Sequence, residues 1–205
     1  MEKYVITIAR GFGSGGKTIA MKLAETLGIN CYEHRIEMLA SQYSGEEENR
    51  FFETFSNASM VNTLGRIPIT RAVIPVISRF SGDKKMYEIQ SQIIHKVADE
   101  ESCVIVGKCA DYVLRDRENV IRIYSDAPRE YCISRVMQRI PGITSSEANK
   151  LIAKTDRYRS DYYKFYTGRD WRDMTNFDLT INTQKMGIDA AIHLIEKYLE
   201  EKHIL

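Results

Sequence analysis

Eight consecutive residues near the amino terminus have types and spacing that suit phosphate chemistry. They read Gly-Phe-Gly-Ser-Gly-Gly-Lys-Thr from Gly11 to Thr18 and match the pattern GxxxxGK[ST]. Glycines let successive backbone N–H groups turn inward around phosphate oxygens. Lys17 can reach the β- and γ-phosphates, and the Thr18 hydroxyl can ligate Mg²⁺. The pattern predicts a site for magnesium-bound nucleotide phosphates whose loop residues are Gly11, Gly13, Ser14, Gly15, Gly16, Lys17 and Thr18.

The residues around this loop predict the structure that must position it. Tyr4–Ala9 is β-branched and aromatic, as a buried strand requires. After the loop, apolar residues recur at helical spacing up to Gly28, which stands where a helix would end. The alternative, a glycine-rich turn that binds nothing, does not explain why strand, motif and helix coincide.

Later parts of the chain distinguish among the classes of protein that carry such loops. A GTPase would have Asn-Lys-x-Asp, and Asn182-Thr183-Gln184-Lys185 is not that sequence. The apolar run Cys103–Val106 is followed by Gly107-Lys108, where an ATPase motor would have Asp. The length of the chain and its two long insertions, residues 33–97 and 140–177, favour a small kinase. Phosphoryl transfer requires that water be excluded, and an insertion that closes over the site as a lid can exclude it.

Basic residues are concentrated in the stretch that leads into and includes most of the second insertion. From Pro128 to Arg172 there are ten Lys or Arg against five Asp or Glu. Arg135 and Arg139 are four residues apart and share a face of a predicted helix. Convergent guanidinium groups both position a phosphoryl group and stabilise its charge. The alternative for any single arginine is an ordinary solvated charge.

Composition limits the class of protein further. The 205 residues are 43% hydrophobic and 28% charged, with a formal net charge of +1. This balance suits one globular domain and does not imply bulk affinity for nucleic acid or an acidic membrane. No apolar run approaches the ~18 residues of a membrane span. The four cysteines lack CxxC spacing, so we expect reduced thiols and a cytoplasmic protein.

Short apolar segments alternate with helical patterns along the chain, which predicts a parallel sheet covered on both faces. Two stretches, 33–97 and 140–177, are longer than simple crossovers. Insertions of this size are usually lids or substrate-binding subdomains, with packed surface helices as the alternative. The expected strands are Tyr4–Ala9, Ile29–Tyr32, Cys103–Val106, Val120–Tyr124 and Leu179–Asn182.

Five segments give the chain a resemblance to the cytidylate kinase-like family. They are Ala9–Gly16, Cys31–Arg35, Val104–Tyr112, Asp156–Arg159 and Asn176–Thr183. The resemblance implies an α/β, three-layer P-loop NTPase fold with a five-stranded parallel sheet of order 2-3-1-4-5. It also implies a single kinase domain over 1–205, with its core at 1–32, 98–140 and 178–205. The remainder would be an acceptor-binding insert (about 33–97) and a lid (about 140–177).

The resemblance also implies roles for individual residues. Arg135 would pack on the donor adenine and Arg139 would reach the phosphates. Arg157 and Arg159 resemble lid arginines that close over the transferred group. With Lys17, the last three of these arginines form the expected catalytic set.

The acceptor side of the site is similar to the family in position and departs from it in detail. Tyr32, Glu33 and Arg35 follow the second strand, where the acceptor nucleotide would bind, but the expected Ser-Gly is absent. Lys108 stands where the family shows an arginine, and it keeps the charge without the bidentate fork. Asp111 is a candidate for a pyrimidine or magnesium contact, with a helix-capping or surface role as the alternative.

These observations predict Mg-ATP-dependent phosphoryl transfer to a small acceptor, most plausibly CMP or dCMP. ATP and Mg²⁺ are the expected cofactors, and nucleic acid and membrane are not expected partners. The protein would act as a monomer or homodimer. A kinase with another acceptor, or an ATP-binding regulator with weak or lost transfer, remains an alternative.

Overall fold

The computed structural model describes residues 3–33, 36 and 84–204. The chain divides into two compact units, Met1–Glu33 with Ile94–Leu205, and His34–Ile93. Most of the expected acceptor-binding insert, including Arg35, lies outside the described residues. The expected boundaries of core, insert and lid stay a prediction.

Five parallel strands form one sheet in the order β2-β3-β1-β4-β5, so the predicted fold and strand order are confirmed. Val5 of the central strand is in register with Cys103 on one side and Val120 on the other. All five carboxyl ends therefore lie at one edge, where the phosphate loop follows β1. The strands are β1 (Val5–Arg10), β2 (Asn30–Tyr32), β3 (Cys103–Val106), β4 (Val120–Asp126) and β5 (Leu179–Asn182).

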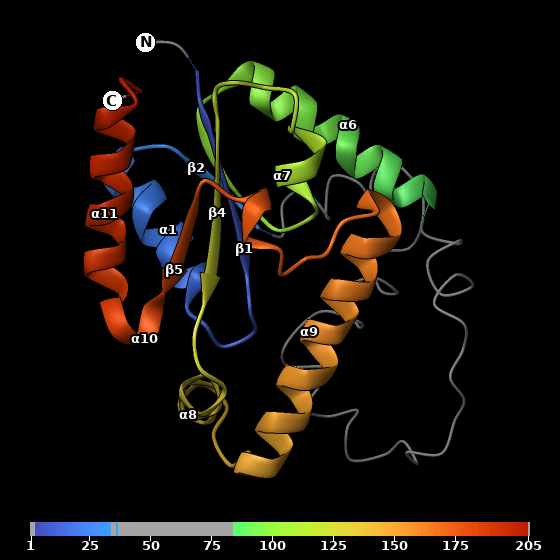
Figure 1. The fold of residues 1–205 in the computed structure, drawn as a ribbon, viewed down its shortest axis with the longest axis vertical. Coiled ribbons are helices and arrows are strands. Elements are labelled where there is room, and N and C mark those ends of the chain that lie inside the picture. The colour runs from blue at the N-terminus through green and yellow to red at the C-terminus, as the bar shows by residue number, and fades with distance from the viewer. Residues whose placement is uncertain (1–2, 34–35, 37–83, 205) are drawn as a thin grey trace. The chain divides into compact units, whose positions relative to one another are not determined.

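Helices connect these strands. They are α1 (Gly16–Leu27), α6 (Lys84–Glu100), α7 (Ala110–Val113), α8 (Arg129–Arg139), α9 (Ser145–Thr167), the 3₁₀ turn η2 (Met174–Asn176), α10 (Thr183–Met186) and α11 (Ile188–Glu201). Figure 1 shows α1 and α11 together on one face of the sheet and α7 on the other. This arrangement gives the three layers that a parallel sheet requires.

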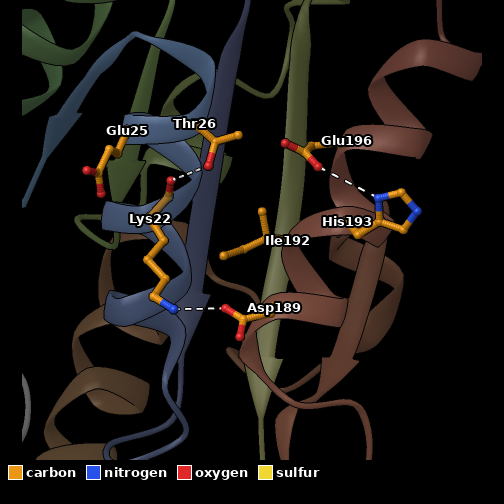
Figure 2. A pocket seen from close by; sticks show the side chains of 7 residues that line it. All are labelled: Lys22, Glu25, Thr26, Asp189, Ile192, His193 and Glu196. Atoms are coloured by element: carbon orange, nitrogen blue, oxygen red, sulfur yellow. Dashed lines mark hydrogen bonds and ion pairs between the residues drawn. The ribbon is translucent and has the colours of Figure 1, made fainter.

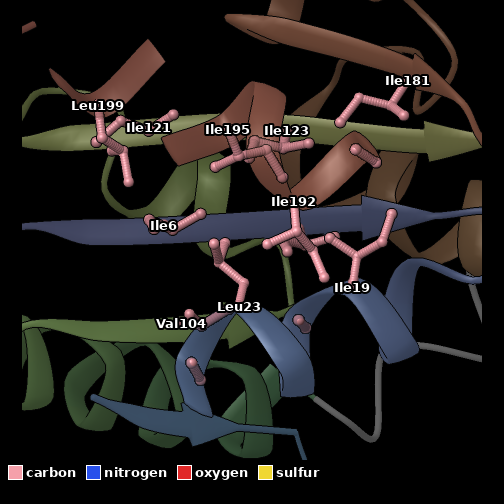
Figure 3. Packing of buried hydrophobic residues seen from close by; sticks show 14 of the residues in the cluster. Ile6, Ile19, Leu23, Val104, Ile121, Ile123, Ile181, Ile192, Ile195 and Leu199 are labelled. Carbon is pink, nitrogen blue, oxygen red and sulfur yellow. The ribbon is translucent and has the colours of Figure 1, made fainter. Parts of the chain in front are cut away.

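The apolar core lies between the sheet and the helix pair α1 and α11. Ile6 from β1 and Ile123 from β4 are buried against Leu23 and Ile195 from these helices (Figure 3). Burying such side chains contributes roughly 25 cal/mol for each Å² of apolar surface. The core thereby fixes α1, whose first turn is part of the phosphate loop.

The expected lid stretch contains the 23-residue helix α9. Thr144 and Glu147 form a capping box at its start, with Glu147 N–H donating to Thr144 Oγ1 and Glu147 Oε2 accepting from Thr144 N–H. Gly168 ends the helix in a left-handed conformation. The helix is thus specified locally at both ends.

Two further sequence-based expectations concern the chain as a whole. All four cysteines are free, as predicted. Within the part of the chain that the structure describes, no helix combines the length and apolar character needed to cross a bilayer.

Candidate active site at the phosphate loop

The phosphate loop follows β1 and is held by backbone hydrogen bonds. Gly11 N–H donates to Ser125 O at 3.0 Å. Gly13 and Gly15 have φ of 82° and 93°, which side chains rarely adopt. A Cβ on Gly13 would also lie 2.8 Å from Cys132 O of α8. Glycine is therefore required at both positions by backbone angle, and at Gly13 by packing as well.

Ser14 anchors the loop to its surroundings. Its buried Oγ lies 3.2 Å from Ser125 Oγ, and its carbonyl accepts a hydrogen bond from Thr183 Oγ1 at 2.5 Å. Its N–H donates to Gly11 O at 3.2 Å. The structure thus gives Ser14 a scaffolding position, and its expected contact with phosphate stays a prediction.

Lys17 and Thr18, the expected phosphate and magnesium ligands, lie in the first turn of α1. Lys17 Nζ is 2.5 Å from Glu33 Oε2, in an ion pair that leaves 39% of the lysine side chain exposed. Thr18 Oγ1 accepts a hydrogen bond from Arg139 Nη2 at 2.9 Å. The structure therefore brings three of the expected site residues, Lys17, Glu33 and Arg139, to the same end of the loop.

Helix α8 presents Arg135 and Arg139, whose spacing predicts a shared face, to the loop. Arg139, in the last turn, makes the contact with Thr18. Arg135 Nη2 lies 3.5 Å from the position that a Cβ on Gly15 would occupy. The same guanidinium lies 5.7 Å from the centre of the Tyr131 ring. Both arginines thus lie beside the loop, and their expected contacts with the donor adenine and phosphates stay predictions.

Helix α9 brings one of the two expected lid arginines to the loop. Arg159 Nη1 donates to Arg10 O at 3.1 Å, and its guanidinium lies 5.6 Å from the centre of the Phe12 ring. Burial, followed by the nearby charge of Arg10, lowers the pKa of Arg159 to about 9. Arg157 is 83% exposed and pairs with Asp161 at 4.0 Å, so this structure does not bring it to the loop.

Asp156 is a site residue that the sequence interpretation missed, although it belongs to the segment that resembles the family. Its Oδ1 accepts a hydrogen bond from Phe12 N–H at 2.8 Å, and its carboxylate lies 3.7 Å from Arg159. Burial raises the pKa of Asp156, and the Phe12 N–H and Arg159 oppose that shift. The carboxylate therefore links α9 directly to the loop.

The turn after β3 has an unusual backbone. Gly107, Lys108 and Cys109 have φ of 74°, 59° and 55°, all in the left-handed region. Burial, together with the charges of Arg10 and Arg159, lowers the pKa of Lys108 to about 7, while Glu33 opposes that shift. Lys108 thus lies among other cations, as a phosphate-binding residue would.

Two other expected acceptor residues are already engaged within the protein. The Tyr32 hydroxyl donates to Glu101. Asp111 is 5% exposed and accepts a hydrogen bond from Tyr163 at 2.6 Å, so a surface role for it is wrong. Cys109, not Asp111, caps α7. The predicted substrate contacts of Tyr32 and Asp111 stay predictions.

A separate surface hollow lies between α1 and α11 (Figure 2). Lys22 Nζ on one side of it is 2.8 Å from Asp189 Oδ1 on the other. His193 Nδ1 lies 3.8 Å from Glu196 Oε2. The Lys22–Asp189 ion pair thus spans the hollow, which contains none of the phosphate-loop residues.

The fold and the loop together define a P-loop kinase. The parallel sheet has this order and carries a glycine loop at the carboxyl end of its central strand, and arginines from two later helices contact residues in or beside that loop. The donor phosphates would be held at the amino terminus of α1, where the helix dipole favours anions.

Comparison with known proteins gives the family. The chain belongs to the cytidylate kinase-like family, whose sequence profile matches residues 5–185, and it is an enzyme of the nucleotide kinase class. A cytidylate kinase from Pyrococcus horikoshii is 26% identical over 199 residues, covering 97% of this chain and 90% of that one.

Two solved structures show the same fold. The crystal structure of an uncharacterized protein from Eubacterium ventriosum is 28% identical, with a TM-score of 0.71 over 97% of this chain and 99% of that one. A shikimate kinase from Bacteroides thetaiotaomicron is 13% identical, with a TM-score of 0.54 over 96% of this chain and 98% of that one. The second similarity concerns the fold alone.

Proposed function

We propose that this protein transfers the γ-phosphoryl group of Mg-ATP to a nucleoside monophosphate, with CMP or dCMP as the acceptor. The observation that carries the proposal is the convergence of Arg139 from α8 and Arg159 from α9 on the phosphate loop. Lys108 follows β3 at the edge of the sheet where the phosphate loop lies, within electrostatic reach of Arg159, and is suited to hold an acceptor phosphate. Family membership and similarity to cytidylate kinases support this choice of acceptor.

The residues present fit ATP and Mg²⁺. Lys17 and the N–H groups at the start of α1 suit a polyphosphate. No group of three or more His, Cys, Asp or Glu in the described part of the chain could hold a metal. Mg²⁺ would be held by the Thr18 hydroxyl together with oxygens of ATP and water, which is common for this ion. Bound Mg²⁺ would supply charge neutralisation between the β- and γ-phosphates.

Each cationic residue then has a part in the reaction. Lys17 holds the donor phosphates, and Lys108 holds the acceptor phosphate. Arg139 and Arg159 stabilise charge on the group in transfer, which is the main task of the protein in this chemistry. Since an acceptor phosphate is already ionised at neutral pH, the reaction needs no general base.

The test is ADP formation from Mg-ATP with CMP, dCMP, UMP, AMP and GMP supplied separately. We expect turnover with CMP or dCMP, and its loss in Lys17→Ala. Lys22→Ala is the matched control, because Lys22 also lies on α1 but pairs with Asp189. Turnover confined to another acceptor would move the proposal to that acceptor, and ATP binding without any turnover would favour a regulator.

We further infer a cytoplasmic location, which the four free cysteines support.

A further inference from the structure

Among the residues that the structure describes, four cationic side chains and two carboxylates interact near the carboxyl ends of β1, β2 and β3. We call them the cation cluster. Glu33 pairs with Lys17 and also acts electrostatically on Arg10, Lys108 and Arg159. The members are Arg10, Lys17, Lys108 and Arg159, with Glu33 and Asp156 as their counter-ions.

Arg10 has the least balanced charge in this cluster. It is the last residue of β1, directly before the loop. Its guanidinium makes no hydrogen bond or ion pair within 4 Å with any described residue. Burial lowers the pKa of Arg10, while the charges of Glu33 and Asp156 oppose that shift. Arg10 is half-buried, and an anionic ligand would supply acceptors to a guanidinium that has lost part of its hydration.

The turn after β3 is built around this guanidinium. A Cβ on Gly107 would lie 2.2 Å from Arg10 Nη1, so no larger residue can stand there while Arg10 keeps its place. Hydrogen bonds from Gly107 N–H to Ile8 O and from Ala110 N–H to Gly107 O hold the left-handed turn. Strained backbone of this kind is concentrated at functional sites. Here it places Lys108 next to Arg10.

We propose that Arg10 and Lys108 form the binding site for the phosphate monoester group of the acceptor, with Arg10 as a substrate-binding residue. Arg10 and Lys108 bring cationic groups to one place beside the phosphate loop, which suits a phosphate group. Arginine offers a planar fork that binds two phosphate oxygens at once, whereas lysine supplies a point charge. Arg10 therefore provides the bidentate grip that Lys108 cannot. This inference rests on the proposed function and adds a residue and a ligand group to it.

The test measures binding of a phosphate monoester apart from catalysis. The protein is first saturated with Mg²⁺ and a non-hydrolysable ATP analogue, which fills the phosphate loop. Ribose 5-phosphate is then titrated by calorimetry, with ribose as the probe that lacks the phosphate. We expect Arg10→Gln to weaken ribose 5-phosphate binding about 10- to 100-fold, the range of a lost charge-assisted contact.

Matched variants make the outcome decisive. Arg117→Gln removes an arginine that pairs with Asp99 at 2.7 Å, and it should leave binding unchanged. Arg10→Lys keeps the charge without the fork and should give an intermediate loss. If Arg10→Gln no longer binds the ATP analogue, Arg10→Lys takes its place in the test. Unchanged ribose 5-phosphate affinity in the variant that retains the analogue would overturn the proposal.

The Arg10 proposal and the proposed function can be rejected separately. Absence of turnover with every monophosphate would reject the nucleotide as acceptor but leave an Arg10-dependent phosphate site in place. Conversely, normal CMP turnover in Arg10→Gln, with an unchanged KM for CMP, would support the proposed kinase activity and reject Arg10 as a substrate-binding residue.

Discussion

The Glu33 carboxylate occupies Lys17, and so it competes with the phosphates that this lysine is expected to bind. The carboxylate is 2.5 Å from Lys17 Nζ and 17% exposed, so it holds the lysine as an internal anion would. A polyphosphate must replace that contact before Lys17 can donate to it. The same carboxylate also offsets repulsion among the cations around it.

Replacing Glu33 therefore separates these two effects. We expect Glu33→Gln to tighten binding of the ATP analogue several-fold, because Lys17 no longer leaves an ion pair. We also expect a lower thermal midpoint, because repulsion in the cation cluster is less balanced. Calorimetry and thermal denaturation measure the two quantities. Glu25→Gln, which changes an exposed glutamate of α1, is the control. Weaker analogue binding would show that Glu33 assists the donor site.

Lys108 makes acceptor binding depend on pH. The charged and titratable groups that act on it are Arg10 from β1, Glu33 after β2, Arg159 from α9 and the neighbouring Cys109. Its pKa in the folded protein is about 7, against an ordinary value of 10.5. Since the unfolded chain then binds more protons between these values, Lys108 makes stability rise as pH increases from about 7 to about 10.

A phosphate dianion should reverse the lowered pKa of Lys108 and draw a proton onto it. We expect uptake of up to one proton per ribose 5-phosphate bound at pH 8, where the ligand itself is already a dianion. Calorimetry in buffers of different ionisation enthalpy measures this number. Lys108→Arg stays charged and should bind with almost no proton uptake. Equal uptake by the two proteins would assign the proton to another group.

Helix α9 has one face in contact with the phosphate loop and another exposed to solvent. Arg157 and Arg159 are two residues apart, so they point to different faces of the helix. One is exposed, and the other bonds Arg10 O. Asp156 completes the inner contact by accepting Phe12 N–H. The helix therefore positions the loop and one arginine through the same turn.

Asp156 variants test this link between α9 and the loop. Asp156→Ala removes the acceptor of Phe12 N–H and a counter-ion of Arg159, and we expect about tenfold weaker binding of the ATP analogue. Asp156→Asn keeps an acceptor oxygen and should lose less. Asp161→Ala, on the same helix but facing Arg157, should bind normally. Analogue affinity measured by calorimetry decides, and equal loss in Ala and Asn variants would point to charge alone.

Much of the whole molecule could be predicted from its sequence, because the signals are local. The phosphate loop, the flanking strand and helix, and the Arg135–Arg139 spacing each lie within one short segment. The contact of Phe12 with Asp156 joins residues 144 positions apart, and no local pattern reports it. Arg10, Glu33 and Lys108 meet because the strand order 2-3-1 places their strands side by side. The left-handed turn that seats Arg10 against Gly107 likewise depends on packing.

Each of the two proposed phosphate sites should therefore raise the thermal midpoint of the whole protein independently when its ligand binds. A ligand at one hundred times its Kd stabilises the folded state by about 2.7 kcal/mol, or roughly 5–10 °C in a domain of this size. We expect Lys17→Ala to lose the shift caused by the Mg-bound ATP analogue and to keep that caused by ribose 5-phosphate. Arg10→Gln should show the reverse, since Arg10 is assigned to the acceptor phosphate. Thermal denaturation with each ligand gives all four shifts, and loss of both shifts in both variants would mean that the cation cluster binds a single polyphosphate.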